Sequence, residues 1–374
     1  MEEAAQRLLD NGILSKSLKE LHNKVITKTE GEKIKTSKLD GSGVNIAFID
    51  QGFDRNMSEF GEVGKGRLKR HMTCIKNEDG MYEIVERTDD RDYQDNYHGN
   101  TAADLAAGEK CGIAPNADVY FFEINSNGED KDYDERVKAI LEYIKTNQKD
   151  LKLDVISHSA GASKEVLKIA DDIRDNYGCE YINSGVSWKN YFPGREIDGK
   201  TYEAGFVESA RAVPGVYKNE NGQFLANEEA MAIPVEGRTS IQVIKDKNGN
   251  VVKESRKFNG AICGASYSIP QLVGWFALAR QMNPKISLKD FIDKTKELQH
   301  TNSKGKLYTN PREVIEKMYE ERETRKYREN DPKISIEDAV RNAINQGIAT
   351  EDTTRARNIE RTNDKNVREV SKDD

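Results

Sequence analysis

The stretch Phe258-Asn-Gly-Ala-Ile-Cys-Gly-Ala-Ser-Tyr-Ser-Ile-Pro270 runs directly into the apolar segment Leu272 to Ala279. It places Ser266 where a glycine-rich turn becomes a helix that is apolar nearly all round, a pattern typical of a helix buried inside a domain. Backbone N–H groups at such a helix start can hold a negative oxygen, and Pro270 suits the first turn, where its missing N–H is not needed. Ser266 is therefore either a helix cap, the commoner role, or a nucleophile that needs a base.

A buried strand and a short helix supply the partners that a nucleophilic serine needs. The segment Gly43 to Gly52 is typical of a buried parallel strand and ends in Asp50, where open α/β sheets place their ligands. His98 begins a helix of small residues. Each has an ordinary explanation, Asp50 as a turn residue and His98 as a structural histidine. Together with Ser266 they would supply the carboxylate, base and nucleophile of a catalytic triad.

The blocks around these three residues resemble the signature blocks of the subtilisin-like serine proteases (subtilases). Two further blocks fall in the family's order, one similar to the strand that lines the substrate cleft and one similar to the Ala-Pro segment. The resemblance spans about residues 39 to 285. In chain order the blocks are the strand ending at Asp50, His98-Gly99 with Gly112-Ile-Ala-Pro-Asn116, Val155-Ile-Ser-His-Ser-Ala-Gly161, Met231-Ala-Ile-Pro234 and Gly264-Ala-Ser-Tyr-Ser-Ile-Pro270.

The resemblance implies a subtilisin-like α/β fold and a serine endopeptidase. In this interpretation Ser266 forms an acyl-enzyme, His98 is the general base and Asp50 orients His98. The backbone of Ser159, Ala160 and Gly161 would pair with an extended peptide substrate. The alternative is a catalytically weak or inactive subtilase-like pseudoprotease that binds peptides or regulates other proteins.

The oxyanion hole needs a second donor besides the N–H of Ser266, and the family supplies an asparagine side chain. Asn183-Ser-Gly resembles the family's Asn-x-Gly, so Asn183 is the candidate. The strand before Asn183 is short, and the usual strand length would put Ser187 in that position. Asn183 would then be a turn residue, and the weaker hole would favour the pseudoprotease.

Some residues depart from the family's pattern without touching a group that transfers protons. They could reshape the cleft. His158 precedes Ser159 in a strand, so the two side chains point to opposite faces and are not expected to form a second catalytic pair. The departing residues are Asn100, Thr101, Ala265 and Tyr267.

Strand-like runs at 44–49, 119–124 and 153–157 alternate with helical patterns at 101–107, 133–146 and 163–176. This alternation predicts an α/β fold in which a mostly parallel central sheet has helices on both faces. We expect an N-terminal extension at 1–38 that packs on a peptidase domain at 39–300, and a charged tail at 301–374, helical and then disordered, which could bind a partner. Three local signals are a hairpin with an Asn248-Gly249 turn and capping boxes that begin at Ser287 and Ser335.

The composition excludes several classes of protein. The net charge is −7, and basic residues are interspersed with acidic ones, so no nucleic-acid partner is expected beside the peptide or protein substrate. The sequence shows neither a signal peptide nor an apolar run that could span a membrane, which predicts a cytoplasmic protein. Cys74, Cys111, Cys179 and Cys263 are far apart, so we expect buried reduced thiols.

No cofactor is required by this chemistry, and no metal ligands are assigned. The acidic clusters at 89–95 and 125–135 could bind calcium, but solvated acidic loops are the simpler interpretation. A third class of function, nucleotide binding by a doubly wound domain, is disfavoured because Gly41-Ser-Gly43 precedes its strand, whereas a dinucleotide fingerprint follows one.

Overall fold

The structure is a computed structural model that describes residues 14–30, 33–88, 98–110, 112–124, 132–183, 265–298 and 311–329, and short segments between 195 and 259 and between 300 and 309. The chain divides into two compact units. The first ends at Tyr319 and the second begins at Glu320. The candidate site and all the packing discussed below belong to the first unit.

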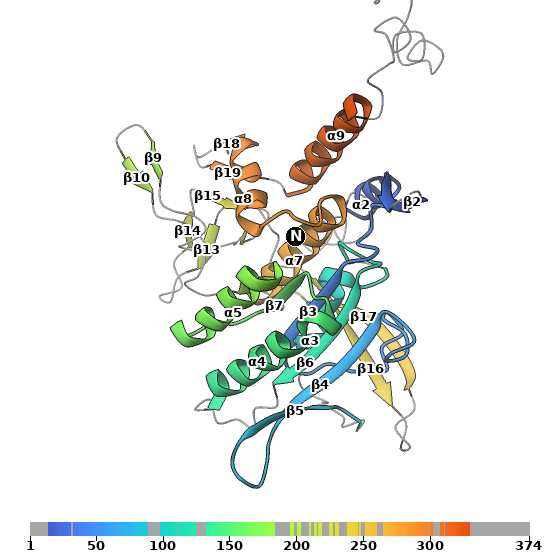
Figure 1. The fold of residues 1–374 in the computed structure, drawn as a ribbon, viewed down its shortest axis with the longest axis vertical. Coiled ribbons are helices and arrows are strands. Elements are labelled where there is room, and N and C mark those ends of the chain that lie inside the picture. Colours follow the sequence, from blue (N-terminus) through green and yellow to red (C-terminus); the bar gives the residue numbers. More distant parts are fainter. Residues whose placement is uncertain are drawn as a thin grey trace, which may run out of the picture. The chain divides into compact units, whose positions relative to one another are not determined.

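Among the described residues, six strands form a central sheet in the order β5-β4-β6-β3-β7-β8 (Figure 1). Neighbouring strands are parallel, except that β5 at the edge is antiparallel to β4. The predicted mostly parallel sheet is confirmed, and the three strands predicted from sequence are the adjacent β6, β3 and β7. The strands are β3 (Asn45–Asp50), β4 (Leu68–Lys76), β5 (Tyr82–Glu86), β6 (Asp118–Ile124), β7 (Val155–His158) and β8 (Glu180–Asn183).

Helices cover both faces of this sheet. Alternate side chains of β3 point to opposite faces, Phe48 into the cluster formed with α3 (His98–Ala107) and α7 (Ala265–Met282), and Ile49 into the other cluster. The second face is covered by α4 (Tyr133–Leu151) and α5 (Lys164–Tyr177), which lie side by side in Figure 1. Because β6 and β7 flank β3 while their connecting helix α4 lies on the face opposite α3, the chain changes faces at β3. Ligand sites of open α/β sheets lie at the carboxyl ends of strands beside such a point.

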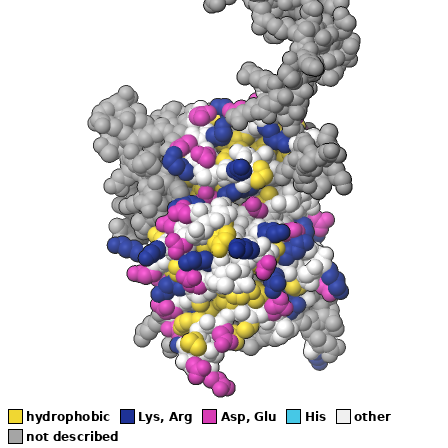
Figure 2. All heavy atoms as spheres, viewed as in Figure 1, with side chains coloured by type: hydrophobic (Ala, Val, Ile, Leu, Met, Phe, Trp, Pro, Cys, Tyr) yellow, Lys and Arg dark blue, Asp and Glu magenta, His cyan; other side chains and the backbone are white. Residues whose placement is uncertain are grey.

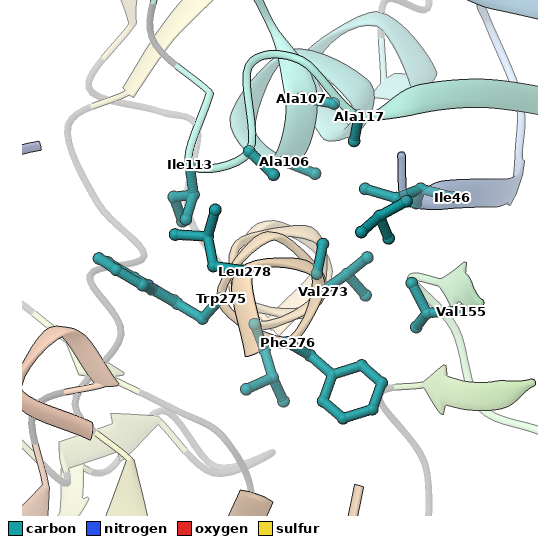
Figure 3. Close-up of a cluster of buried hydrophobic side chains, with 14 of the residues drawn as sticks. Ile46, Ala106, Ala107, Ile113, Ala117, Val155, Val273, Trp275, Phe276 and Leu278 are labelled. Carbon is teal, nitrogen blue, oxygen red and sulfur yellow. The ribbon is translucent and has the colours of Figure 1, made fainter. Parts of the chain in front are cut away.

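The helix α7 is buried on all sides, as its sequence predicts. Figure 3 looks along α7 and shows Ile46 of β3, Val155 of β7 and Ala106 of α3 around it. A Cβ atom on Gly274 would lie 3.0 Å from the carbonyl oxygen of Ala106 and 2.8 Å from the Cβ of Ile113. Glycine at this position therefore lets α3 and α7 pack closely.

Segments from both ends of the first unit join the core around α7. The N-terminal elements are α2 (Leu14–His22), β1 (Val25–Glu30) and β2 (Lys33–Lys38), of which Leu21 and Ile26 are fully buried. Near the other end, Val314 and Ile315 of α9 (Pro311–Glu329) are also fully buried. The first compact unit thus includes segments on both sides of residues 39–300, because a few apolar side chains within charged sequence supply a packing face.

Several local predictions are confirmed. The strands β16 (Arg238–Lys245) and β17 (Val251–Asn259) form the expected antiparallel hairpin. A capping box with Ser287 and Asp290 begins α8 (Leu288–Glu297). The Asn248-Gly249 turn and the Ser335 capping box lie outside the described residues. The remaining short strands are β9 (Arg195–Ile197), β10 (Lys200–Tyr202), β11 (Ser209–Ala210), β12 (Val213–Pro214), β13 (Val216–Lys218), β14 (Phe224–Ala226), β15 (Glu229–Met231), β18 (His300–Thr301) and β19 (Leu307–Thr309).

The surface and the cysteines agree with the composition. On the described part of the face in Figure 2, basic and acidic side chains are interspersed. Cys74 and Cys179 are buried free thiols, and burial raises the pKa of Cys74 to about 11, so that thiol is not poised for reaction. Cys111 and Cys263 lie outside the described residues. In the described part of the chain, no helix is long and apolar enough to cross a membrane.

Candidate active site

Asp50 and His98 form the best-defined pair of the site. Asp50 ends β3, and its Oδ1 atom lies 2.7 Å from Nδ1 of His98 and accepts a 2.7 Å hydrogen bond from the N–H of Gln51. The Asp50 side chain is 7% exposed and that of His98 is 24% exposed. A carboxylate oxygen can only accept, so Nδ1 of His98 carries the proton and Nε2 of the neutral ring is left as an acceptor.

The start of α3 is attached to the loop that follows β3, and this attachment places His98. The N–H of Gly99 donates to the carbonyl of Gln51 at 2.7 Å, and the N–H of Asn100 donates to the carbonyl of Gly52 at 3.2 Å. In return, Oδ1 of the buried Asn100 accepts a 2.7 Å hydrogen bond from the N–H of Asp54. Gly52 has a φ of +72°, a conformation that favours glycine. Asn100, unusual for the family, is therefore part of the connection between α3 and β3.

The electrostatics of His98 suit a base. Burial by itself would lower the pKa of His98, but the hydrogen bond and the charge of Asp50 outweigh burial, so that the pKa lies above 6.5. A base with a pKa near the working pH is both available and strong enough to take a proton.

Ser266 lies at the start of α7 and exchanges two hydrogen bonds with Ser159. The Ser159 hydroxyl donates to the Ser266 carbonyl at 2.8 Å, and the Ser266 hydroxyl donates to the Ser159 carbonyl at 3.2 Å. As the second residue of the helix, Ser266 has an N–H without an intrahelical acceptor. The structure corrects the expected place of Pro270, which is the sixth residue of α7 and so lies in the second turn. Because proline has no N–H, Pro270 cannot donate to the carbonyl of Ser266 four residues earlier. The Ser159 hydroxyl donates to that carbonyl instead.

The structure brings the histidine and the serine to the same edge of the sheet. The ring of His98 lies against that of Tyr267, the residue after Ser266, with centroids 5.1 Å apart and planes inclined by 36°. Phe48 of β3 pairs with Ser157 of β7, so Asp50 and Ser159, each two residues further on, point to the face that carries α3 and α7. Asp50, His98 and Ser266 thus come from three elements, β3, α3 and α7, and the ring of His98 lies against the residue that follows Ser266.

Asn183 is not brought to this group of residues. It ends β8, is 1% exposed and pairs with His158, and its side chain interacts with the hydroxyl of Tyr181. These side chains share the face covered by α4 and α5, opposite the face of Ser266. Residues 184–194, which include Ser187, lie outside the described residues. The N–H of Ser266, in the first turn of α7, has no intrahelical acceptor.

The predicted substrate-binding residues follow directly after β7. The pairing of β7 with β8 ends at His158 and Asn183, so residues 159–161 lie beyond the last paired residues of the two strands. Ser159 and Ala160 are half-buried and Gly161 is exposed, and a Cβ atom on Gly161 would have no neighbour within 4 Å. This short segment has open space beside its backbone.

Two buried polar clusters were missed by the sequence analysis. The first consists of His158 with Tyr133 and Tyr181, behind the site. The second consists of Glu123, Arg87 and His71: Glu123 pairs with Asp50 across β6 and β3 and contacts Arg87, and His71 lies 3.4 Å from Glu123. The sequence did contain a signal for these clusters, because polar residues occupy positions in the strands whose side chains point into the core. His158 is 1% exposed and lies on the face opposite Ser159, as the alternation of the strand predicts.

The expectation that the two acidic clusters are solvated loops, with calcium binding as the alternative, stays a prediction. Residues 89–97 and 125–131 lie outside the described residues, and they hold most of both acidic clusters. Of the acidic residues that are described there, Asp132 lies 3.5 Å from Nζ of Lys76 and Glu135 lies 2.5 Å from Nζ of Lys138. Within the described residues, no group of three or more histidines, cysteines or carboxylates is placed to hold a metal ion.

Residues 41–199 match the model of the subtilase family. The match covers less than half of the chain and confirms the resemblance in this part of the sequence, and with the sheet it defines the fold as a subtilase-like α/β fold. It covers Asp50, His98 and residues 159–161, while Ser266 lies beyond it. The family match supports a serine protease in general. No curated protein matches the chain.

Solved structures of several proteases are similar to the chain. One is from Pseudoalteromonas arctica PAMC 21717, at 15% identity over 75% of this chain and 91% of the other, with a TM-score of 0.45. Another is the CspB protease of Clostridium perfringens, at 11% identity over 75% and 95%, with a TM-score of 0.47. A third is fervidolysin from Fervidobacterium pennivorans, a keratinolytic enzyme related to subtilisin, at 16% identity over 74% and 43%, with a TM-score of 0.43.

Proposed function

We propose that the chain is a serine endopeptidase that cleaves peptide bonds through an acyl-enzyme on Ser266. His98 takes the hydroxyl proton on Nε2 and returns it to the leaving amine, and Asp50 holds the imidazole in the required tautomer and stabilises the imidazolium. The observation that carries the proposal is the 2.7 Å contact between Asp50 and His98, on a ring that lies against the residue next to Ser266. The family match supports the coarser assignment.

The chemical step requires the Ser266 hydroxyl to change its partner. Its O–H points to the Ser159 carbonyl at 3.2 Å, and a hydroxyl has one hydrogen to donate. Rotation of the hydroxyl towards His98 lets the proton leave as the oxygen attacks. The oxygen of the tetrahedral intermediate would then lie at the N-terminus of α7, where the N–H of Ser266 and the helix dipole favour negative charge.

The segment after β7 supports a peptide or protein substrate. Residues 159–161 follow β7 and have no strand partner in the described part of the chain, and the space beside Gly161 is open. An extended peptide would pair with this backbone and place its scissile carbonyl near Ser266, which is already bonded to Ser159. An unfolded or looped protein segment fits such a site.

A serine-directed fluorophosphonate probe tests the proposal. We expect covalent labelling of the wild-type chain and of Ser268→Ala, and loss of labelling in Ser266→Ala. Ser268 is the matched control because it lies in the same helix two residues further on. If the wild type is not labelled, or if Ser266→Ala is labelled equally, the proposal is wrong.

Cleavage of a proteome-derived peptide library, read by mass spectrometry, then separates the enzyme from the pseudoprotease. We expect internal cuts with the wild type and none with Ser266→Ala. Binding of peptides by the wild type without any cut would instead establish a peptide-binding protein on the same fold.

A further inference from the structure

His158 is held between two tyrosine hydroxyls in the core behind the candidate site. Its Nε2 lies 2.8 Å from the hydroxyl of Tyr133, the first residue of α4, and its Nδ1 contacts the hydroxyl of Tyr181 in β8. The His158 side chain is buried, and Tyr181 is 6% exposed. The ring of Tyr133 is stacked on that of His158, with centroids 5.8 Å apart and planes inclined by 17°. We call these three residues the His158 clamp.

The three side chains of the clamp are uncharged, and their hydrogen-bond donors and acceptors are complementary. Burial lowers the pKa of His158 to about 4, against smaller effects of Asp50 and Asp134 that raise it, and burial raises the pKa values of both tyrosines. A neutral imidazole has one donor and one acceptor nitrogen, so one tyrosine donates to His158 while the other accepts from it. Both ring nitrogens of His158 are hydrogen-bonded at the same time only when the ring keeps this orientation. The two hydrogen bonds therefore hold the ring rigidly in place.

The position of the clamp connects it to two of the three elements of the site, β3 and α7. His158 ends β7 and pairs with Ile49, the residue before Asp50. The next residue, Ser159, points to the other face and exchanges its two hydrogen bonds with Ser266. Displacement of the His158 backbone would therefore move Ser159 and, through it, the first turn of α7.

We propose that His158 is a positioning residue, fixed by Tyr133 and Tyr181, that holds Ser159 where it sets the hydroxyl and the first helical turn of Ser266. This inference rests on the proposed function of Ser266. A merely structural clamp would stabilise the core and leave the reactivity of Ser266 unchanged.

The first test compares Tyr181→Phe with Tyr143→Phe in the full chain. Phenylalanine keeps the ring and removes the hydroxyl, and Tyr143 is the matched control because it packs on the same face, against Phe122, away from His158. We expect Tyr181→Phe to slow fluorophosphonate labelling and kcat by about 10-fold or more, with KM nearly unchanged, since small displacements of reacting groups cost up to about 10²-fold. Equal rates for both variants and the wild type would overturn the proposal.

A double-variant cycle tests the route through Ser159. If the clamp acts through the Ser159 hydroxyl, Tyr181→Phe slows labelling strongly in the wild type and less in Ser159→Ala. That variant has lost the bond from the Ser159 hydroxyl to the Ser266 carbonyl and keeps only the bond from the Ser266 hydroxyl to the Ser159 carbonyl. Independent effects that multiply would contradict this route. Tyr143→Phe should give the same small factor in both backgrounds.

Hydrogen exchange tests the clamp even if the proposed function fails. In Tyr181→Phe, amides of residues 157–161 and of the first turns of α7 should exchange faster than in the wild type, and in Tyr143→Phe they should not. If the wild type is not labelled but the variants show this exchange pattern, the proposed protease function is wrong. The proposal that the clamp positions Ser266 then still holds. Unchanged exchange in both segments would refute the clamp as a positioning device.

Discussion

The Ser159 hydroxyl donates a 2.8 Å hydrogen bond to the carbonyl of Ser266, at the place where the helix cannot supply a donor. In a regular helix this carbonyl would accept from the N–H four residues later, but that residue is Pro270. The proline thus leaves the start of α7 dependent on a strand residue. This relationship connects the end of β7 to the candidate nucleophile through the backbone of the helix.

Ser159→Ala should therefore destabilise the chain, and Pro270→Ala should partly rescue it. Loss of the hydroxyl leaves a half-buried carbonyl without its donor, at a cost of about 1 kcal/mol in the free energy of unfolding. Alanine at 270 restores an N–H that can donate to the same carbonyl. Urea denaturation of the four chains of the cycle should show a coupling of about 0.5 kcal/mol or more between the two positions.

Additive effects of the two substitutions would show that Pro270 and Ser159 do not share the Ser266 carbonyl. Ser163→Ala serves as a control for the loss of a serine hydroxyl, because Ser163 caps α5 and accepts from the N–H of Val166. It should lower stability to a similar degree, and Pro270→Ala should not rescue it.

The rate of fluorophosphonate labelling should rise with pH, with a midpoint above 6.5. Labelling needs neutral His98, and although burial favours the neutral ring, the hydrogen bond and charge of Asp50 hold the pKa of His98 above 6.5. Asp50→Asn removes that charge and leaves burial, so the midpoint should move to lower pH. The plateau rate should fall by about 10⁴, as expected when the ring loses its oriented tautomer.

Asp54→Asn is the charge-matched control for this profile. Asp54 lies in the loop after β3, but it is not among the groups that shift the pKa of His98. Its substitution should leave the midpoint in place. A midpoint that does not move in Asp50→Asn would mean that the labelling rate reports a group other than His98.

Periodicity and turn chemistry predicted much of the fold. The buried runs that became β3, β6 and β7 carry long apolar segments, and the capping signal at Ser287 is local, so both could be inferred from neighbouring residues. The pair β4 and β5 was missed because its strands mix charged and apolar residues at a sheet edge. The burial of Val314 in α9 was missed for a related reason, since charged neighbours outnumber the apolar side chains that pack.

The residues of the site also divide into those that local sequence patterns predict and those that depend on contacts distant in the sequence. Asp50, His98 and Ser266 lie at the ends of elements with strong local patterns, so their positions follow once the elements are found. The position of Asn183 depends on the register of β8 against β7, and in a strand a shift of one residue reverses the face. No local pattern fixes that register. Ser159 and Ser266 are 107 positions apart in the sequence, so a contact of this kind depends on the assembled fold.

His158 should make the chain less stable as the pH falls from about 6.5 to about 4. In this interval the unfolded chain binds a proton on His158 and the folded chain does not, because burial lowers the folded pKa to about 4. The lost stability is on the order of 3 kcal/mol, since one unit of pKa corresponds to about 1.4 kcal/mol. Urea denaturation at several pH values should show that the advantage of the wild type over His158→Leu shrinks by this amount across the interval.

The comparison with His158→Leu removes contributions from other groups that titrate, among them His98, whose raised pKa acts with the opposite sign. A constant difference between the two chains from pH 6.5 to pH 4 would show that His158 takes up its proton in the folded chain as easily as in the unfolded one.

Gly99→Ala should separate His98 from Asp50. A Cβ atom at this position would lie 2.5 Å from Cζ of Phe121 and 2.9 Å from the carbonyl oxygen of Gln51, so the start of α3 must move away from the end of β3. Such crowding costs about 1–3 kcal/mol of stability, and the displaced histidine should slow labelling by up to about 10²-fold. With a weaker bond to Asp50, the pH midpoint of the remaining labelling should also move to lower values.

Gly274→Ala distinguishes this displacement from a general loss of stability. Its Cβ atom would meet the Cβ of Ile113 at 2.8 Å, a crowding of the same kind two helical turns beyond Ser266. Both variants should lower the free energy of unfolding, but the pH midpoint should move in Gly99→Ala alone, because only that glycine adjoins the Asp50–His98 contact. A midpoint that moves equally in both would mean that the contact responds to packing throughout the core, and that the attachment of α3 to β3 has no special role in placing His98.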